Sequence, residues 1–356
     1  MVTAYLNRIS TAVPDHDVHE TFMGFAERIL QQDNRHALFR RMAGRAQIDH
    51  RWSCLKPDDA GQFLSLDQDG FYRSGSFPST ATRMRQYEAA APDLADKAVT
   101  GLQITRPSAI THLIIISCTG LSAPGLDFHL MEKFDLPSSI ERTSVGFMGC
   151  YAALNGLKLA RHIVRSDPDA QVLMVSLELC TLHLQDTGDL EQVLSFMIFG
   201  DGCAAAVISS EQEGLALDSF RSVMVPETSE HITWAIGDQG FDMVLSGQVP
   251  ASIAQSLGQQ MHEFLPSGGI DDIDLWAVHP GGRSVLDAVQ QAFDLPASAM
   301  AHSREVLRTC GNMSSATVLF VLDAMMRDPS IKAGSRGCGM AFGPGIVAET
   351  MRFTLV

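Results

Sequence analysis

Cys150 stands in a local sequence that suits nucleophilic chemistry. It follows Gly149 and opens a segment with helical periodicity, so it is expected at the N-terminus of a helix. That end of a helix carries positive partial charge and free N–H groups, which favour the thiolate over the thiol. Because most cysteines are buried structural residues, the alternative is that Cys150 only packs in the core.

His279 and Asn312 are the candidates for holding a developing oxyanion. His279 ends an apolar, strand-like segment and precedes a Gly-rich loop, and active sites of α/β proteins collect at the carboxyl ends of strands. Asn312 precedes a very apolar helical segment. An imidazole and a side-chain amide can both donate to an oxyanion. The alternatives are a core histidine with satisfied hydrogen bonds and an asparagine that only caps the following helix.

These residues must be positioned by an α/β fold, because apolar segments bounded by turn residues alternate with helical patterns. Buried strands are predicted at residues 111–117, 171–177, 203–209, 273–278 and 346–353. Helices are predicted at residues 125–134, 152–165, 284–293 and 313–327. This order of elements occurs twice in outline, which indicates an internal duplication. No linker separates the halves, so we expect one shared core with a break near residues 209–214.

The composition excludes several classes of protein. Of the 356 residues, 46% are hydrophobic and 19% are charged, which is typical of a globular protein with a large core. The net charge of −15 argues against a nucleic-acid binder, which usually presents a basic face. No segment approaches the ~20 apolar residues of a membrane helix, and the N-terminal segment lacks the pattern of a signal peptide. We therefore expect a cytoplasmic protein.

Metal and disulfide sites are not expected either. The seven cysteines include no CxxC pair, which argues against a zinc ribbon or a disulfide framework. The DHDVH sequence at residues 15–19 superficially resembles a ligand cluster. Since it lies at an expected helix start, a solvated cap is the better interpretation.

Several motifs resemble those of the chalcone synthase-like, or type III, polyketide synthases. They are Gly149-Cys150 and the sequences HPGG at 279–282, GNMSSA at 311–316 and FGPG at 342–345, in the family's order and spacing. The FGDG sequence at 199–202 is similar to a family turn. The last motif departs from the usual GFGPG by one residue, because Ala341 stands where the family has glycine. The resemblance runs from about residue 110 to the C-terminus, and the first hundred residues match only loosely.

The resemblance implies a duplicated thiolase-type αβαβα five-layer sandwich, which normally forms a homodimer. On this basis, residues 1–211 form an N-terminal half that carries the nucleophilic cysteine. Residues 212–356 form a C-terminal half that carries the histidine and the asparagine.

The resemblance also implies a reaction and the residues that perform it. Cys150 would carry the acyl group taken from an acyl-CoA starter, and His279 would keep it ionised through an ion pair. His279 and Asn312 would hold the malonyl thioester carbonyl and stabilise the enolate formed as carbon dioxide leaves. Phe199 matches the aromatic residue between the coenzyme A tunnel and the cavity. The substrates would be malonyl-CoA and an acyl-CoA, with no metal and no cofactor.

The coenzyme A phosphates need cations, and four arginines lie between residues 40 and 51 of this acidic chain. In the family a basic cluster in this region receives the phosphates, and Arg45 and Arg51 match it best. An ordinary solvated helix face is the alternative. Gly281 and Gly282 of the HPGG sequence are assigned to the same CoA-binding site.

The resemblance places further residues on the wall that binds the substrate: Cys118, Cys180, His183, Ser314, Gly343 and Pro344. Cys118, Cys180 and His183 stand where the plant chalcone synthase has threonine, whereas Ser314 keeps the family's serine. These changes argue against a phenylpropanoid starter. Cysteine at position 118 resembles bacterial enzymes that make pyrones, resorcinols or hydroxylated naphthalenes.

We therefore expect a fatty acyl-CoA starter and an alkylpyrone or alkylresorcinol product. A malonyl-primed tetrahydroxynaphthalene product is the second choice. A ketoacyl-ACP synthase III is the closest rival, although its histidine motif usually reads more like HQAN than HPGG. A non-catalytic acyl-binding protein is the rival from another class, and the presence of all three catalytic residue types weighs against it.

Overall fold

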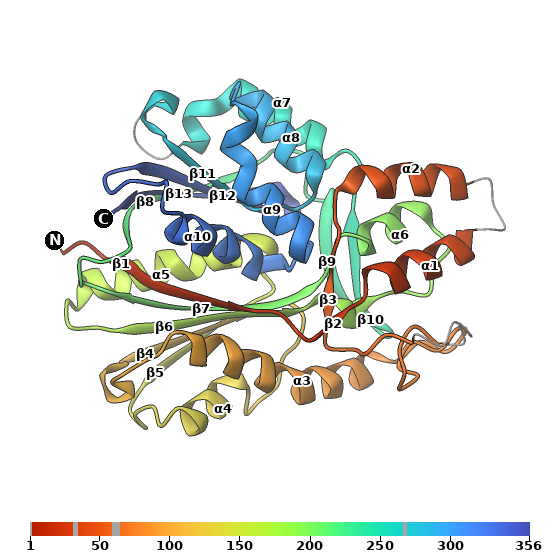
Figure 1. Ribbon diagram of the computed structural model, residues 1–356, viewed down its shortest axis with the longest axis horizontal. Helices are drawn as coiled ribbons and strands as arrows, with labels where there is room; N and C mark the ends of the chain where they lie inside the picture. Colours follow the sequence, from red (N-terminus) through yellow and green to blue (C-terminus); the bar gives the residue numbers. More distant parts are fainter. Residues whose placement is uncertain (1, 31–34, 59–64, 266–268) are drawn as a thin grey trace.

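A large central sheet organises the molecule, as the computed structural model shows for residues 2–30, 35–58, 65–265 and 269–356 (Figure 1). Within these residues the strand order is β11-β12-β13-β8-β1-β7-β6-β4-β5. The strands of the first half are β1 (Tyr5–Ala12), β4 (His112–Ser117), β5 (Glu141–Gly146), β6 (Val172–Leu179) and β7 (Asp201–Ser209). Those of the second half are β8 (Leu215–Met224), β11 (Leu275–Val278), β12 (Arg336–Gly343) and β13 (Val347–Leu355).

The two halves of the sheet repeat one topology. In the first half β4 is parallel to β6, β6 is antiparallel to β7, and β7 is antiparallel to β1. The second half repeats these directions: β11 is parallel to β12, β12 is antiparallel to β13, and β13 is antiparallel to β8. The halves join where β1 pairs with β8, at Tyr5↔Ala216 and Leu6↔Leu215. The duplication predicted from the sequence is therefore present in the strand order.

Helices form three layers around the two halves of the sheet (Figure 1). The middle layer holds α5 (Ala152–Ser166) and α10 (Thr317–Arg327), and Leu157 of α5 and Leu322 of α10 are fully buried in the same core cluster. The outer layers are α3 (Thr80–Gly101) with α4 (Leu126–Lys133), and α7 (Val249–Phe264), α8 (Arg283–Ala292) and α9 (Ala301–Cys310). This arrangement is the predicted αβαβα sandwich. Among the described helices, none combines the length and apolar character needed to cross a membrane.

The remaining elements gather at one end of the sheet, which is the right-hand end in Figure 1. They are β2 (His16–Asp17), α1 (His19–Ile29), α2 (His36–Ala46), β3 (Trp52–Ser53), α6 (Leu190–Phe196) and the hairpin of β9 (Ile232–Gly237) and β10 (Gly240–Leu245). Strands β4 and β6 end here, so the segments that follow these two strands lie next to the helices and the hairpin just named. The candidate site residues lie among these segments.

Candidate active site

Cys150 lies in a tight turn between β5 and α5. The short 3-10 turn η3 (Gly149–Tyr151) leads directly into α5, so the predicted position at a helix start is correct. Gly149 has a φ of +73°, and a Cβ atom there would lie 2.4 Å from Cδ of Pro344. Glycine is needed at this position because the chain bends through left-handed space directly against the Gly343-Pro344 turn.

His279 lies directly after β11 and is almost completely buried, with 1% of its surface exposed. Its backbone N–H donates to the carbonyl of Met340 at 2.7 Å, which continues the pairing of β11 with β12. Neither ring nitrogen has a hydrogen-bond partner among the residues that the structure describes. A core histidine with satisfied hydrogen bonds is therefore not what the geometry shows. A buried imidazole without protein partners is free to bind a ligand.

Asn312 fulfils both functions considered for it. Its Oδ1 atom accepts a hydrogen bond from the backbone N–H of Ser314 at 2.8 Å, which caps the turn η7 (Ser314–Ala316) before α10. Its Nδ2 atom points the other way and lies 3.3 Å from the carbonyl oxygen of Gly281, a long contact. The amide also hydrogen-bonds the thiol of Cys150 and lowers its pKa. Capping therefore uses the oxygen of Asn312 and leaves the donor nitrogen at the nucleophile.

The three candidate residues converge although they are far apart in sequence. Turns η3 and η7, which begin the equivalent helices α5 and α10, pack against each other. Asn312 contacts both Cys150 and Gly281, and a Cβ atom on Gly281 would lie 3.7 Å from Nε2 of His279. The site therefore lies where the helix starts of the two halves meet, beside the loop after β11.

Burial sets the charge states of the nucleophile and the imidazole. It raises the pKa of the Cys150 thiol to about 11, against the opposing effect of hydrogen bonds from Ser314 and Asn312. It lowers the pKa of His279 to about 3. Burial by itself thus favours a thiol beside a neutral imidazole. The ionised Cys150 expected from the sequence requires transfer of its proton to His279, so that two opposite charges form together.

A narrow pocket opens beside Cys150, which we call the catalytic pocket. About 480 Å³ of it is free of protein atoms. Five of the predicted substrate-binding residues line it: Cys118, Cys180, Phe199, Ser314 and Pro344. The sequence analysis missed Phe196, Trp234 and Met243, which line it too and come from α6 and the β9–β10 hairpin.

His183 supports the wall of the pocket from behind and does not line it, contrary to the prediction. The residue is fully buried, its Nε2 atom lies 2.6 Å from the carbonyl oxygen of Thr119, and its Nδ1 atom accepts from the N–H of Phe241 at 3.0 Å. Its ring stacks on Phe241 with a centroid distance of 4.2 Å. These contacts use both ring nitrogens, so His183 has no hydrogen-bonding atom left for a substrate.

Glu178 is a buried carboxylate next to the site that the sequence analysis did not identify. It lies in β6 and accepts hydrogen bonds from the backbone N–H of Cys118 at 3.0 Å and from Oγ1 of Thr119 at 2.7 Å. The hydroxyl of Ser315 also donates to it. Burial raises its pKa. A carboxylate inside a buried strand that is otherwise apolar except for Ser176 was the signal that could have revealed it.

The two arginines assigned to coenzyme A have different environments. Arg45 is exposed on α2, and its carbonyl oxygen accepts from Nη1 of Arg283, the first residue of α8 after the Gly281-Gly282 loop. Arg51 is only 2% exposed, and its Nη1 atom donates to the carbonyls of Phe196 and Phe199 at 3.1 Å. Arg51 is therefore a buried structural cation, and the prediction that it meets a phosphate was wrong.

The DHDVH segment lies at the start of α1, as predicted, but the N-cap residue Val18 makes no side-chain capping hydrogen bond. Oδ1 of Asp17 accepts from the N–H of His19 at 3.0 Å at the start of α1, and Oδ2 pairs with His50 at 2.7 Å. Among the described residues, no three His, Cys, Asp or Glu side chains come together in a way that could hold a metal ion.

Comparison with known proteins gives two successive family matches. Residues 3–212 match the N-terminal domain of the chalcone and stilbene synthases, and residues 216–356 match their C-terminal domain. The alpha-pyrone synthesis polyketide synthase-like Pks18 of Mycobacterium tuberculosis is 36% identical over 283 residues, which cover 76% of this chain and 72% of that protein. The 1,3,6,8-tetrahydroxynaphthalene synthase of Streptomyces peucetius subsp. caesius is 34% identical over 245 residues, covering 67% and 65%.

A solved structure gives the same result for the fold. The crystal structure of PKS-I from the brown alga Ectocarpus siliculosus superposes with a TM-score of 0.86 and 28% identity, covering 100% of this chain and 99% of that one. The family matches, the relatives and the superposed structure all indicate the same family. The protein therefore belongs to the chalcone and stilbene synthase family and is a type III polyketide synthase.

Proposed function

We propose that Cys150, His279 and Asn312 perform both half-reactions of this polyketide synthase. The observation that carries the assignment is the buried imidazole of His279, which has no partner among the described residues. It begins the loop whose Gly281 carbonyl contacts the amide of Asn312, and that amide hydrogen-bonds the thiol of Cys150. We infer that this arrangement brings a nucleophile and two hydrogen-bond donors together, as transfer of an acyl group followed by enolate formation requires.

In the first half-reaction the thiol proton of Cys150 passes to His279. The thiolate attacks the carbonyl carbon of an acyl-CoA, and the sulfur of coenzyme A leaves with the proton from His279. The hydrogen bonds from Ser314 and Asn312 support this step, because they favour the thiolate against the cost of burial. The acyl group is then held as a thioester on Cys150.

In the second half-reaction malonyl-CoA loses carbon dioxide. The bond between its carboxyl and α carbons breaks, and the electron pair forms an enolate whose oxygen accepts hydrogen bonds from His279 and Asn312. The α carbon then attacks the thioester on Cys150 and expels its sulfur. The product is an acyl-CoA extended by two carbons, which can reload for another round. No metal or redox cofactor is needed in this route, because the electrons come from the broken carbon–carbon bond.

For the substrate we propose a straight-chain acyl-CoA starter and a pyrone-type or resorcinol-type product. The relative Pks18, named for alpha-pyrone synthesis, supports this choice, and so does the narrow, mainly apolar catalytic pocket. The tetrahydroxynaphthalene synthase among the relatives favours a malonyl-primed naphthalene as the second candidate. The ketoacyl-ACP synthase III alternative is not favoured, because both domains match the chalcone and stilbene synthase models.

We also propose a cytoplasmic homodimer that forms at the β5 edge of the sheet. Strand β5 ends the sheet order, and five of its six residues are exposed. Leu121, Phe128 and Met148 are large apolar side chains that are between 38% and 49% exposed. Exposed apolar side chains beside an unpaired strand edge support a contact with a second copy. All seven cysteines are free thiols, which fits a reducing compartment.

The proposed function is tested by incubating the enzyme with malonyl-CoA and a panel of acyl-CoA starters. Mass spectrometry of the products should show starter-dependent masses, each increased by two-carbon units and formed with release of carbon dioxide. A malonyl-only product that is the same with every starter would instead support the naphthalene candidate. Activity that requires malonyl-ACP and stops after one extension would refute the proposal.

A further inference from the structure

A chain of hydrogen-bonding side chains leads away from the catalytic thiol through the interior of the protein. Its first links are the contacts of Oγ of Ser314 with the sulfur of Cys150 at 3.7 Å and with the sulfur of Cys118 at 3.3 Å. The thiol of Cys118 in turn lies 3.3 Å from Oε1 of Glu178. A thiol, a hydroxyl and a carboxyl group can each release a proton and accept another. These contacts therefore connect the catalytic sulfur to a buried carboxylate.

The chain continues on the other side of Glu178. Oγ1 of Thr119 donates to Oε2 of Glu178 at 2.7 Å and lies 3.5 Å from Oγ of Ser117. The hydroxyl of Tyr87 donates to that same serine oxygen at 2.9 Å. All four residues are buried, with at most 5% of their surface exposed. The contact between Thr119 and Ser117 is the longest between two oxygen atoms, so it is the weakest link of the path.

Ser117 and Tyr87 line a groove at the surface of the molecule, which we call the β5 groove. It lies along β5 and the start of α4, and its rim includes the exposed side chains of Leu121 and Phe128. About 1130 Å³ of this space is free of protein atoms, including open solvent. Water can therefore reach the outer end of the hydrogen-bonded path. The proposed contact with a second copy borders this groove, so the path requires the groove to hold water within the dimer.

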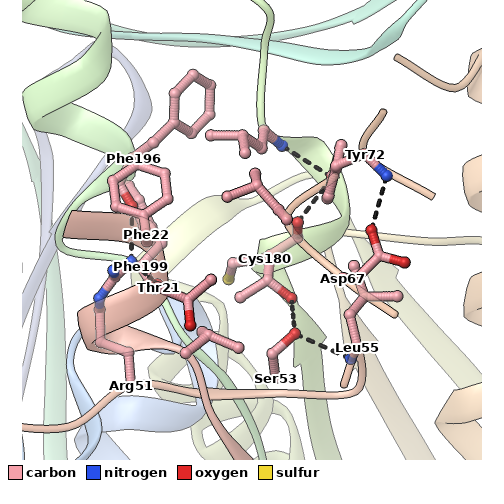
Figure 2. A pocket seen from close by; sticks show the side chains of 14 residues that line it. Thr21, Phe22, Arg51, Ser53, Leu55, Asp67, Tyr72, Cys180, Phe196 and Phe199 are labelled. Atoms are coloured by element: carbon pink, nitrogen blue, oxygen red, sulfur yellow. Dashed lines mark hydrogen bonds between the residues drawn. The ribbon is translucent and has the colours of Figure 1, made fainter. Parts of the chain in front are cut away.

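The wall of the catalytic pocket at Cys180 offers a different environment (Figure 2). The space behind it is mainly apolar, and the polar groups around that space bond one another. Oγ of Ser53 lies 2.7 Å from Oγ1 of Thr181 and accepts from the backbone N–H of Leu55 at 3.0 Å. No dashed line in Figure 2 reaches the sulfur of Cys180. Among the residues drawn there, none connects this wall to water through hydrogen bonds.

The proposed reaction consumes one proton in each round of extension. In the first half-reaction the proton of Cys150 leaves with coenzyme A, and in the second the sulfur of Cys150 is expelled as a thiolate. Malonyl-CoA enters as a carboxylate at neutral pH, so its decarboxylation supplies an electron pair and no proton. A proton must therefore reach the sulfur from solvent before the next acyl-CoA can load and release protonated coenzyme A.

We propose that Ser117, Thr119 and Glu178 carry protons from water in the β5 groove to the sulfur of Cys150. The inference rests on the proposed function and adds a route for the proton that each extension consumes. The extended product is itself a CoA thioester and occupies the narrow catalytic pocket when the thiolate forms. A route from behind the pocket delivers the proton without passing the bound product.

Each link of the path passes on one proton and receives another. The thiolate of Cys150 takes the proton of the Ser314 hydroxyl, which is replaced from the thiol of Cys118 and then from the carboxyl of Glu178. Glu178 regains its proton through the two hydroxyls that lead to the β5 groove, and the outer hydroxyl takes it from water. In sum, one S–H bond forms on Cys150 and one O–H bond of water breaks, which leaves a hydroxide ion for the buffer. No group is oxidised or reduced.

Glu178 suits the middle of this path because its environment helps it to hold a proton. Burial raises its pKa above the ordinary value of 4.5, although hydrogen bonds from Ser315, Thr119 and Cys118 act in the opposite direction. The other titratable groups that interact with it electrostatically are the thiols of Cys118, Cys150, Cys180 and Cys203 and the phenol of Tyr87. Burial raises the pKa of each of these groups, so they carry a proton at neutral pH and Glu178 is the acid of the set.

The test separates bond formation from return of the proton. Ser117→Ala removes the hydroxyl that connects Thr119 to the β5 groove and leaves the groups around Cys150 in place. Acylated enzyme mixed rapidly with malonyl-CoA should form one extended product per site at the wild-type rate, because this step needs no new proton. Later rounds should slow by about 10²-fold, the lower end of the usual effect of a positioned proton donor. This slow phase should show a larger solvent deuterium isotope effect than the wild-type steady state.

Two matched variants control for structural effects of the substitution. Ser176→Ala removes another buried serine hydroxyl, which lies 2.9 Å from Oγ of Ser315 on a branch that does not line the β5 groove. It should keep the wild-type rates of both phases. Ser117→Thr keeps a hydroxyl at the outer link and should restore the later rounds.

The outcomes separate this inference from the proposed function. If wild-type enzyme forms no extended product from any acyl-CoA, the proposed function fails and the proton route falls with it. If wild-type enzyme extends starters but Ser117→Ala keeps the rate of later rounds, or slows no more than Ser176→Ala does, the β5 groove does not supply the proton. A Ser117→Ala protein that lacks the circular dichroism spectrum of the wild type is replaced by Thr119→Val. In that variant a first round followed by slow later rounds supports the proposal, and unchanged later rounds overturn it.

Discussion

The hydroxyl oxygen of Ser314 lies 3.7 Å from the sulfur of Cys150. The same oxygen is 3.3 Å from the sulfur of Cys118, so one hydroxyl lies between two thiols. Ser314 adopts a φ of +47°, which is uncommon for a residue with a side chain, and the hydrogen bond from its N–H to Oδ1 of Asn312 helps to hold it there. Asn312 thus positions the serine that contacts the nucleophile.

Cys150→Ala should abolish formation of extended products, because no other group in the proposed mechanism carries the acyl chain. His279 and Asn312 remain in this variant, so malonyl-CoA should still lose carbon dioxide at a measurable rate. Radiolabelled malonyl-CoA gives both readouts in one assay, as labelled product and labelled gas. We would abandon the assignment of Cys150 as nucleophile if the variant made extended product at more than trace levels.

Asn312→Ala should slow the decarboxylation of malonyl-CoA by about 10²–10³, which is the usual cost of losing one oxyanion donor. It should also destabilise the fold by about 1 kcal/mol, because Oδ1 caps the turn before α10. Asn312→Asp provides the matched control, since it keeps an acceptor oxygen and loses the donor. Full activity in Asn312→Asp would show that capping is the only function of this residue.

His279→Ala should shift the reactivity of Cys150 to higher pH. Without an imidazole to take the proton, burial alone acts on the thiol, and its pKa of about 11 leaves little thiolate at neutral pH. The rate of iodoacetamide alkylation at pH 7 should fall at least tenfold relative to wild type. Identical pH profiles for the two proteins would mean that His279 does not take the proton of Cys150.

Arg45→Ala and Arg51→Ala should have opposite consequences. Arg45 is exposed, so its loss should raise KM for CoA thioesters about fivefold, equivalent to ~1 kcal/mol, and leave the melting temperature unchanged. Arg51 is buried with hydrogen bonds to two carbonyls, so its loss should destabilise the fold by about 2–3 kcal/mol. Thermal melts and steady-state kinetics distinguish the two, and an unchanged KM in Arg45→Ala would remove Arg45 from the CoA site.

The free energy of unfolding should depend on pH through His183. Burial lowers its pKa from 6.5 to about 3, so below pH 6.5 the unfolded chain binds a proton that the folded chain does not. This contribution to stability is present above pH 6.5 and decreases by up to ~1.4 kcal/mol per pH unit as the pH falls towards 3. Asp201 acts in the opposite direction between its ordinary value of 3.8 and its raised pKa of about 6.

His183→Phe isolates the histidine contribution, because it removes the titrating group and can still stack on Phe241. The slope of unfolding free energy against pH between 6 and 4 should change by about 1.4 kcal/mol per unit, with the contribution of Asp201 retained. Urea unfolding at a series of pH values measures this slope. Equal slopes in variant and wild type would show that His183 does not titrate differently in the two states.

The sequence predicted those parts of the fold that depend on short patterns of apolar and turn residues. Apolar segments bounded by turn residues predicted β4, β6 and β7 within a few residues, and the repeated order indicated the duplication. The predicted helix at 313–327 begins as the 3-10 turn η7, and α10 starts at Thr317, because Asn312 caps a tight turn first. The β9–β10 hairpin was not predicted, although it supplies Trp234 and Met243 to the catalytic pocket.

The role of a site residue could be predicted where a short motif fixes its backbone. It could not be predicted where packing against distant segments determines the direction of its side chain. Cys150 follows the glycine of a tight turn, and His279 directly follows strand β11 and precedes a Gly-rich loop, so local sequence positions both residues. His183 and Arg51 were assigned by position, but their side chains are buried among residues from distant segments. Sequence position gives the segment on which a side chain lies, whereas its direction depends on tertiary contacts such as the stacking of His183 on Phe241.

The contact between turns η3 and η7 determines whether the two halves of this enzyme could work as separate fragments, and which residues should change together in evolution. The repeat has equivalent helix starts in both halves, yet one copy supplies the sulfur and the other supplies the amide. Neither copy holds a complete reaction centre, so an isolated half is expected to be inert, whereas two separately expressed fragments could regain turnover by reassociating. Residues on the two sides of the contact between η3 and η7 would therefore be expected to change together during evolution.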